Sequence, residues 1–381
     1  MARRKRRQPT RFRVGRVTVY FHHGAWWFYY REHGRPVRCT AAEARGEAEQ
    51  LAAQVNAQLS TGSPTLLAFT SITIPELRQQ FLEYHEHVLK SSLGTVQRYR
   101  AATQHLETFA LQHGQSPPAH AIRPEAFAAY LRRIDVAPNG HAHSAKRKLR
   151  DKGVRFILET CRAMFTYAFK QRHLPPYAGN PFAALPLDHL KIEDAKPIFV
   201  FTADTELTFF RATSRSAFPI HFVLAKTGLR VGELTHLLIE ELDLAGGWLY
   251  VRNKPGLAWR IKTGSERVVP LLPEVVAVFR HVIGSRAAGP VFLRERFTPN
   301  VPPKLVGDLA ALERVCVERQ AAAEVPPSRH EVLRIACTVW RDAGAIKADA
   351  VRCSFVRVMK AIGLPRASCP KSWRHSFATL L

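Results

Sequence analysis

The chain opens with short runs of apolar residues that alternate with polar ones and are separated by turn residues. VTVYF, WWFYYRE and RPVRCT, within residues 17–40, have the β-branched and aromatic content of strands and predict a small three-stranded sheet. In the segment that follows, apolar residues such as Leu51, Val55 and Leu59 recur at helical spacing. Thr-Gly-Ser-Pro at 61–64 then predicts a linker. Residues 1–63 are therefore expected to form a sheet-plus-helix domain.

Residues 70–190 have the pattern of a helical domain. Thr73, followed by Pro75 and Glu76, predicts the start of its first helix. Four apolar residues of this helix are expected on one face: Leu77, Phe81, Tyr84 and Val88. Further helices are expected within 95–111, 124–134 and 152–174, and Asn-Pro-Phe at 180–182 follows the last of them.

Residues 198–381 mix helical and strand patterns. Thr202 and Thr205 predict the cap of a helix, and residues 220–251 read as a buried helix, a tight Thr-Gly turn, a second helix and a strand. LYVRN and the later WRIKTGSERVVPL predict adjacent strands, and PKSWRHSFATLL predicts a final amphipathic helix. The expected fold class is mainly α with small β elements (α+β), with a mixed α/β third domain.

The charge balance points to a polyanionic partner. Lys and Arg number 56 against 31 Asp and Glu, which gives a formal net charge of +25. Double-stranded DNA is the commonest partner of such a surface, and an anionic membrane is the alternative. No apolar run approaches the roughly 18 residues of a membrane span, and the basic start lacks the apolar stretch of a secretory signal. We therefore expect a cytoplasmic, nucleoid-associated protein with no membrane contact.

The six cysteines, Cys39, Cys161, Cys316, Cys337, Cys353 and Cys369, contain no Cys-x-x-Cys pair. This scatter is typical of reduced thiols rather than of a disulfide framework or a zinc site. We expect neither a structural metal nor another cofactor.

A basic run lies just before the last helix of the second region. Its cations are Lys146, Arg147, Lys148, Arg150, Lys152 and Arg155, against the single acid Asp151. Two interpretations are open: a solvated helical face, which most charge runs are, or a contact with DNA phosphates.

Five residues of the third region are candidates for chemistry. Arg230 follows the Thr-Gly turn, at the start of a helix whose apolar residues point into a core, so it needs a partner or a ligand. Glu233, three residues on, could be that partner, and an ion pair alone would explain both. Lys262 lies in a hairpin, where it could reach a ligand or simply be exposed. Lys371 and Arg374, at i and i+3, project together from the final helix.

Taken in order, TGLRVGEL, the strand with Lys-Thr and ERVVPL, and SWRHSFATL resemble the catalytic domain of tyrosine recombinases, the phage integrase family. The helical region that ends in Asn-Pro-Phe resembles the family's core-binding (SAM-like) domain. The sheet-plus-helix at 1–63 resembles the arm-site-binding domain of many integrases of mobile elements. The stretch from about 301 to 348 matches poorly and is interpreted as an insertion.

The resemblance implies an enzyme that cuts one DNA strand by attack of a tyrosine on a phosphodiester. It would form a 3′-phosphotyrosyl link without a metal, and it would act as a homotetramer on DNA. Arg230 and Arg374 match the family's two arginines, which meet charge on the nonbridging oxygens. Lys262 matches the lysine that protonates the leaving 5′-hydroxyl. Lys371 stands where the family usually has His; His375 is a weaker substitute, since it lies roughly 100° round the helix from Arg374.

The family places a His or Trp and then the nucleophilic Tyr downstream of this motif, whereas the sequence ends at Leu381 in mid-pattern of an amphipathic helix. The expectation is a chain cut short that recognises DNA but does not cleave it. The alternative is a non-catalytic DNA-binding protein that occupies recombination sites or regulates transcription. A type IB topoisomerase shares the chemistry, but the small N-terminal sheet argues against it.

Overall fold

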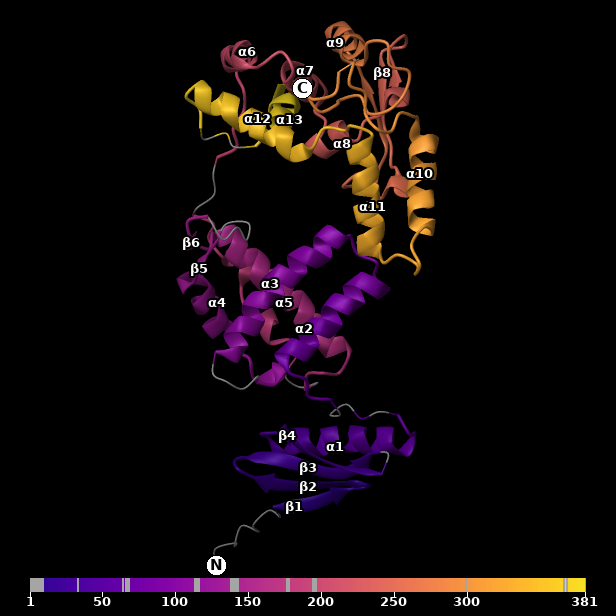
Figure 1. The fold of residues 1–381 in the computed structure, drawn as a ribbon. Helices are drawn as coiled ribbons and strands as arrows, with labels where there is room; N and C mark the ends of the chain where they lie inside the picture. The colour runs from indigo at the N-terminus through magenta and orange to yellow at the C-terminus, as the bar shows by residue number, and fades with distance from the viewer. Residues whose placement is uncertain are drawn as a thin grey trace, which may run out of the picture. The chain divides into compact units, whose positions relative to one another are not determined.

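The computed structural model describes residues 10–32, 34–63, 65, 69–112, 117–137, 144–175, 179–193, 197–298, 300–365, 367 and 369–380. The chain divides into two compact units, residues 1–195 and 196–381. The first unit contains an N-terminal sheet with one helix and a group of helices; the second is a mixed helical domain with a small sheet (Figure 1).

The N-terminal sheet has four antiparallel strands rather than the three predicted. They are β1 (Arg11–Val14), β2 (Val17–His22), β3 (Ala25–Glu32) and β4 (Arg35–Ala42), in that spatial order. The additional strand β1 is RFRV, in which Arg alternates with Phe12 and Val14. Both apolar residues pack against the core of the sheet. The sequence therefore contains the alternation of a strand here, although the segment is rich in arginine.

The sheet buries one face beneath helix α1 (Arg45–Ser60), as Figure 1 shows. Alternate residues of β2 and β3 supply the core, among them Val19 and Phe28, which are fully buried against Ala52 and Val55 of α1. The other set of alternate residues includes Tyr20, above which the guanidinium of Arg38 lies 5.4 Å from the ring centroid. This strict alternation gives the sheet one apolar and one polar, aromatic face.

The helical group of the first unit surrounds a second apolar core. Its elements are α2 (Ile74–Glu83), a π-helical turn (Tyr84–Val88), α3 (Leu93–Leu111), α4 (Pro124–Arg133), β5 (Asp135–Val136), β6 (Arg147–Lys148) and α5 (Asp151–Lys170). Thr73 caps α2, since its backbone N–H and hydroxyl both bond to Glu76 as the sequence predicts. Short 3-10 turns connect these elements at 119–121, 181–184 and 187–189.

The π-helical turn overturns one prediction from the helical pattern. The amide of Leu89 bonds to the carbonyl of Tyr84 at 2.9 Å, five residues back instead of four. The wider turn accommodates an extra residue, so side chains beyond it are rotated relative to those before it. Phe81 is buried as expected, but Val88 is 67% exposed.

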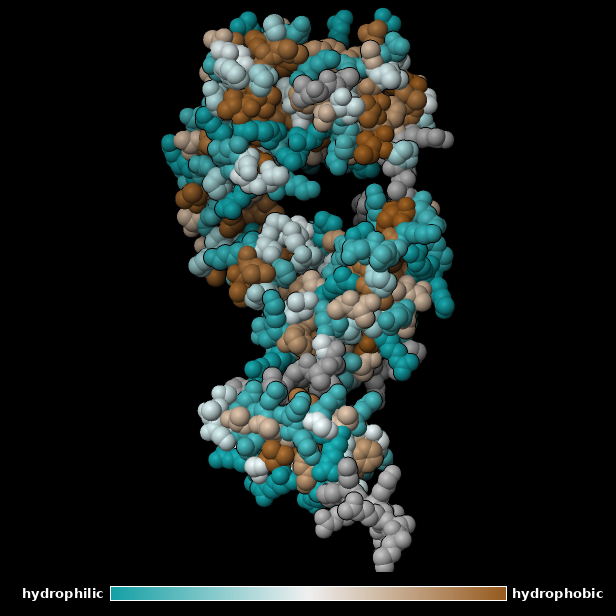
Figure 2. Space-filling model, turned by 180° about the vertical axis from the view of Figure 1, so that it is seen from behind, coloured by the Kyte–Doolittle hydropathy of each residue, from teal (hydrophilic) through white to brown (hydrophobic). Residues whose placement is uncertain are grey.

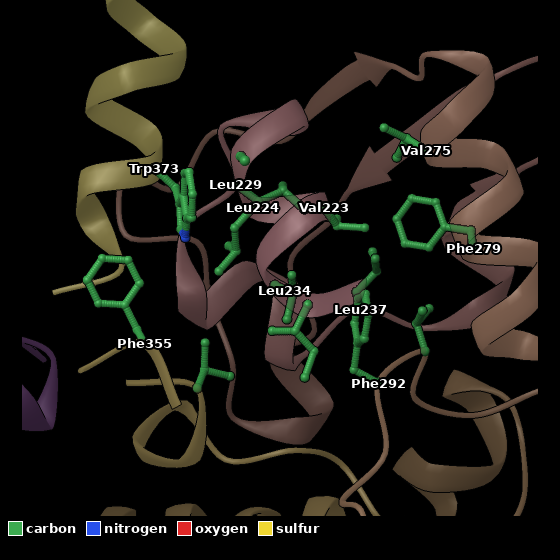
Figure 3. Close-up of a cluster of buried hydrophobic side chains, with 14 of the residues drawn as sticks. Val223, Leu224, Leu229, Leu234, Leu237, Val275, Phe279, Phe292, Phe355 and Trp373 are labelled. Carbon is green, nitrogen blue, oxygen red and sulfur yellow. The ribbon is translucent and has the colours of Figure 1, made fainter. Parts of the chain in front are cut away.

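The second unit consists of helices packed around a single large core and a three-stranded antiparallel sheet. Its elements are α6 (Ala203–Ala212), α7 (Phe218–Thr227), α8 (Val231–Thr235), β7 (Leu242–Asp243), β8 (Trp248–Val251), β9 (Arg267–Pro270), α9 (Pro273–Ile283), α10 (Leu309–Ala321), α11 (Arg329–Asp342), α12 (Ala348–Ala361) and α13 (Lys371–Leu380). Figure 3 shows core side chains from α7, α8, α9, α12 and α13 converging on one interior.

Helix α13 is docked in this core mainly through Trp373, which is 1% exposed. Its ring stacks on Phe201, with centroids 3.8 Å apart and planes 8° from parallel. The hydroxyl of Ser376 accepts the backbone N–H of Phe201 at 2.7 Å. An aromatic stack and a buried hydrogen bond therefore tie the final helix to the segment that leads into α6.

Helices α10 and α11 form a hairpin with a smaller core of their own, built around Leu312, Val339 and Trp340. The hairpin occupies most of the stretch that matched the family pattern poorly. Through Leu257, this core also reaches the long excursion between β8 and β9.

The visible face of each unit is largely hydrophilic, with apolar residues in separate patches (Figure 2). Among the described residues, no helix combines the length and apolar character needed to cross a membrane. The six cysteines are free thiols.

Candidate functional site

The site is built on a sharp turn between α7 and α8. Gly228 ends α7 with φ +60°, and its N–H bonds to the carbonyl of Leu224 at 3.2 Å. A Cβ at this position would lie 2.5 Å from Cδ1 of Phe377, on α13. Only glycine meets both conditions, a left-handed backbone and close approach of another helix. The turn fixes Arg230 directly before α8.

Arg230 is paired with Glu233, as its spacing predicted. Nη1 of Arg230 donates to Oε1 of Glu233 at 2.8 Å, and the backbone N–H of Arg230 donates to Oε2 at 2.9 Å. The side chain of Glu233 is 3% exposed, whereas that of Arg230 is 30% exposed. The carboxylate is thus buried, while part of the guanidinium remains open to a ligand.

Arg267, on β9, is a second partner of the same carboxylate, and the sequence reasoning missed it. Its Nη2 donates to Oε2 of Glu233 at 2.6 Å and its Nη1 to Oε1 at 3.1 Å, in a bidentate fork. Burial alone would raise the pKa of Glu233, but the hydrogen bonds from Arg267 and Arg230 outweigh it and lower the pKa to about 2. Glu233 is therefore a stable anion.

A signal for Arg267 was available in the strand register. Arg267 lies opposite Val251 in the antiparallel pair, and Val251 is buried. Directly opposed residues point to the same face of a sheet, so Arg267 also faces inward. An inward-facing arginine requires an acceptor, but its identity depends on the packing of α8 against the sheet.

Arg374 reaches the same cluster from α13. Its Nη1 donates to the carbonyl of Gly228 at 2.6 Å. Burial lowers the pKa of this guanidinium, as do the positive charges of Arg230 and Arg267, while Glu233 acts in the opposite direction. Arg230 and Arg374, 144 residues apart in the sequence, are thereby brought into one electrostatic neighbourhood.

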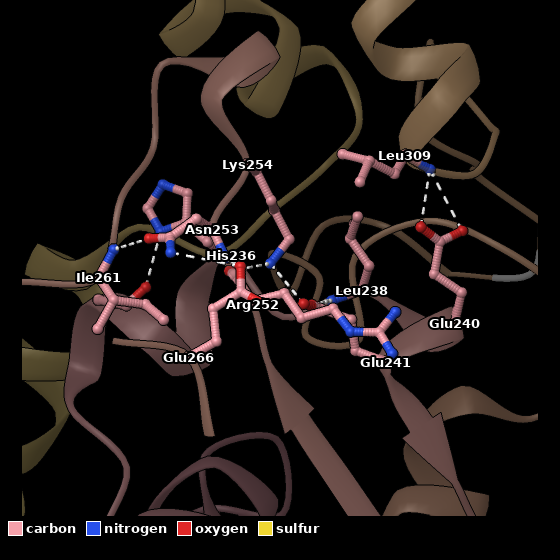
Figure 4. A network of polar contacts seen from close by, with 11 residues as sticks. His236, Leu238, Glu240, Glu241, Arg252, Asn253, Lys254, Ile261, Glu266 and Leu309 are labelled. Carbon is pink, nitrogen blue, oxygen red and sulfur yellow. Dashed lines mark hydrogen bonds and ion pairs between the residues drawn. The ribbon is translucent and has the colours of Figure 1, made fainter. Parts of the chain in front are cut away.

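Lys262 lies in the excursion between β8 and β9, and its side chain is exposed. A polar network holds this excursion, as Figure 4 shows. Asn253 accepts the backbone N–H of Ile261 at 2.8 Å and donates to the carbonyl of Gly264 at 3.0 Å, while Glu266 accepts the N–H of Asn253 at 2.8 Å. These hydrogen bonds close the loop on both sides of Lys262.

A buried ion pair anchors the start of the excursion. Nζ of Lys254 lies 2.8 Å from Oε1 of Glu241, with 2% and 4% of the two side chains exposed. Burial lowers the pKa of Lys254 and raises that of Glu241, and the attraction between the partners opposes both changes. Nζ of Lys254 also lies 4.8 Å from the ring of Trp259, which stacks on His236 just beyond α8. The excursion is thus packed against the segment that carries Arg230.

Lys371 is the first residue of α13 and is exposed, whereas Arg374 and His375 are partly buried. Among the described residues, hydrogen bonds join Arg230, Glu233 and Arg267, and link Arg374 to Gly228; Lys262 and Lys371 lie outside this set. The cluster holds three guanidinium groups and one carboxylate, so its net charge is positive.

The basic run of the first unit begins at the short strand β6 and continues into α5. Five of its cations are exposed: Lys146, Arg147, Lys148, Arg150 and Lys152. Lys148 forms an exposed ion pair with Asp135 at 3.2 Å, and Arg150 immediately precedes α5. Arg155 pairs with Glu159 instead. The exposed cations are placed to meet solvent or a polyanion.

A family model matches most of the second unit. Residues 210–381 match the model of the phage integrase family.

A curated relative matches this chain over a short span. The tyrosine recombinase XerC of Pelobacter propionicus is 40% identical over 77 residues, which cover 19% of this chain and 23% of that protein. The chain thus matches about a quarter of the length of this relative.

Solved structures resemble the fold over a longer span. The Tn1549 transposon integrase (residues 82–397), in complex with circular intermediate DNA, is 17% identical with a TM-score of 0.53, covering 82% of this chain and 87% of that one. A lambda integrase dimer bound to a COC′ core site is 16% identical with a TM-score of 0.44, covering 98% and 97%.

Proposed function

We propose that the protein is a site-specific DNA recombinase or integrase that binds duplex DNA and acts on a phosphodiester. The observation that carries this proposal is the cluster in which Arg230 and Arg374, from separate helices, surround a turn of fixed backbone. Guanidinium groups suit the nonbridging oxygens of a phosphate, because they offer paired N–H donors and a permanent charge. The family of residues 210–381 and the DNA in the Tn1549 integrase structure support the same assignment.

In the proposed reaction a tyrosine hydroxyl releases its proton to solvent and attacks the phosphorus, and the bond to the 5′-oxygen breaks. The protein is left joined to the 3′-phosphate. Arg230 and Arg374 bind the nonbridging oxygens, whose charge grows as the fifth bond to phosphorus forms. Lys262 gives a proton to the departing 5′-oxygen, and the exposed excursion between β8 and β9 suits a group that must reach DNA. Rejoining reverses these steps, so no metal or external energy source is required.

The tyrosine is not supplied by the second unit as far as Leu381. Tyr250 is the one tyrosine in residues 196–381, and it lies opposite Val268, on the other face of the hairpin from Arg267. We propose that the nucleophile is a tyrosine outside residues 196–381. Lys371, where the family usually has His, is proposed to contact the phosphate as a cation.

The rest of the DNA contact is assigned to basic surface in the first unit. We propose that residues 1–63 bind arm-type sites, that 70–190 form the core-binding domain and that 198–381 form the catalytic domain. The exposed cations around β6, such as Arg147 and Lys152, would contact phosphates of the duplex. Assembly as a homotetramer on DNA is part of the same proposal.

A suicide-substrate assay tests the cleavage step. A nicked duplex, selected from a random pool by binding, is incubated with the 381-residue chain and with a version extended by any codons that follow Leu381 in its reading frame. A covalent protein–DNA adduct on a denaturing gel with the extended protein alone supports the recombinase with a downstream nucleophile. The extended protein with Arg230→Ala is the matched control, since it should bind but give no adduct.

The alternative is a non-catalytic DNA-binding protein that occupies recombination sites or regulates transcription. The observation in its favour is Lys371, which stands where the family usually has His. No adduct with either protein, together with tight binding that weakens steeply as salt rises, would select this alternative. Binding that is insensitive to salt would refute both.

A further inference from the structure

The carboxylate of Glu233 is fully occupied by hydrogen bonds. Oε1 accepts from the Nη1 atoms of Arg230 and Arg267, and Oε2 accepts from the backbone N–H of Arg230 and from Nη2 of Arg267. Each oxygen has two lone pairs, so these four bonds satisfy the group. Glu233 therefore has no remaining acceptor for substrate, and its effect on a bound phosphate is through its charge.

That charge opposes the function proposed for the cluster. Glu233 is 3% exposed and held as an anion, so a phosphate bound by Arg230 and Arg374 would feel its repulsion at close range. Without Arg267, the two arginines and Glu233 would have a net charge of +1. A phosphodiester carries one negative charge, and the five-coordinate transition state of its cleavage carries about two.

Arg267 restores the balance. Its guanidinium is bidentate to Glu233, and it lies close enough to Arg374 to influence the protonation of that residue. The three guanidinium groups and one carboxylate sum to a charge of +2, which equals the charge that the reaction develops. The side chain of Arg267 is 31% exposed, so it is not enclosed by the protein.

We propose that Arg267 is a charge-balancing residue of the scissile-phosphate site. It neutralises Glu233, so that Arg230 and Arg374 act on the phosphate with their full positive charge. Glu233 in turn fixes the guanidiniums of Arg230 and Arg267 through three of its four hydrogen bonds. The proposal rests on the proposed function, because it takes the ligand to be a DNA phosphate.

The test measures one phosphate at a time and does not require cleavage. The probe is a duplex selected from a random pool, in which ethylation interference locates the phosphate where wild type and Arg230→Ala differ. That phosphate is then replaced by a neutral methylphosphonate. The ratio of the two dissociation constants, methylphosphonate over phosphate, is the phosphate ratio, and it reports the local charge of the site while overall affinity cancels.

Arg267→Gln should lower the phosphate ratio about tenfold, which corresponds to about 1.4 kcal/mol. Arg267→Lys keeps the charge and should retain most of the ratio. The decisive variant is the double substitution Glu233→Gln/Arg267→Gln, which returns the net charge to +2 and should recover the ratio. The matched control is Arg252→Gln, whose guanidinium lies 4.9 Å from the ring of Tyr250 on the opposite face of the hairpin and should leave the ratio unchanged.

Each outcome assigns a separate failure. If no phosphate distinguishes wild type from Arg230→Ala, or if Arg374→Ala keeps the wild-type ratio, the proposed function is wrong. If Arg374→Ala lowers the ratio but Arg267→Gln does not, the proposed function stands and the role of Arg267 is overturned. A double variant as low as Arg267→Gln alone also overturns the proposal, because it shows that Arg267 acts by holding structure rather than by its charge. Thermal unfolding of every variant verifies that each is folded.

Discussion

Replacement of Gly228 by alanine should undock helix α13 from the turn that carries Arg230. Two independent costs follow from the structure. The φ of +60° places a non-glycine residue in the left-handed region, at about 1–2 kcal/mol. The added Cβ would lie 2.5 Å from Phe377, so that ring or the whole helix must move, at a further 1–3 kcal/mol. The total is about 2–5 kcal/mol of the stability of the second unit.

The assay is chemical and thermal unfolding, combined with hydrogen exchange of peptides from α7 and α13. For a domain of this size, the loss should lower the melting temperature on the order of 10 °C. Hydrogen exchange should rise most in α13, because an added Cβ at position 228 pushes this helix away from the turn. The contacts of Trp373 and Ser376 that hold α13 in the core would then be weakened. The carbonyl of Gly228 also accepts a hydrogen bond from Arg374. Loss of the contact between α13 and the turn should therefore displace Arg374 and lower the affinity for DNA.

Gly232→Ala is the matched control, four residues along in α8. A Cβ there meets nothing within 4 Å, and alanine is the better helix former by about 1 kcal/mol. This variant should be as stable as wild type or slightly more so. The reasoning would be refuted by a Gly228→Ala protein within about 0.5 kcal/mol of wild type, or by equal destabilisation of the two variants.

Three further predictions concern the polar network. The pKa of Glu233 is lowered from 4.5 to about 2, so the ionised carboxylate stabilises the folded state fully above pH 4.5, and this contribution is lost as pH falls toward 2. Glu233→Gln should remove this pH-dependent part of the free energy of unfolding, about 3 kcal/mol. Identical pH dependence of unfolding in the variant and the wild type would contradict the prediction. Lys254→Met should cost about 3–5 kcal/mol in urea unfolding by leaving Glu241 buried and unpaired, and adding Glu241→Gln should recover most of it, whereas an unaffected single variant would argue against the ion pair. Asn253→Ala removes the side-chain hydrogen bonds to Ile261 and Gly264, worth about 1 kcal/mol each, so hydrogen exchange around Lys262 should quicken about 30-fold. Unchanged exchange would show that these bonds do not hold the loop.

Features encoded locally were predictable from the sequence. Thr73 with Glu76 and Thr202 with Thr205 give the helix starts that the structure has, because capping depends on residues within one turn. Arg230 and Glu233 likewise meet at the i, i+3 spacing of a helix. The mainly helical fold with small antiparallel sheets follows from the same periodicities.

Features that depend on distant contacts were not predictable. Arg267 meets Glu233 across 34 residues, and only the packing of α8 against the sheet brings the two together. The strand β1 has its two apolar residues between arginines of a basic segment, and it was not among the predicted strands. Phosphate contact by Lys262 and Lys371, and the division of the chain into three functional domains, stay predictions.

The π-helical turn at Tyr84–Val88 has a consequence for comparing this chain with its relatives. A π turn holds one more residue than an α turn, so it is what a helix becomes when a single residue is inserted and the flanking ends are kept in place. A relative with a regular helix here should align with a one-residue gap between 84 and 88. An alignment that forbids the gap would assign Leu77 and Phe81 correctly but shift every position after the turn by one, and would pair buried residues with exposed ones.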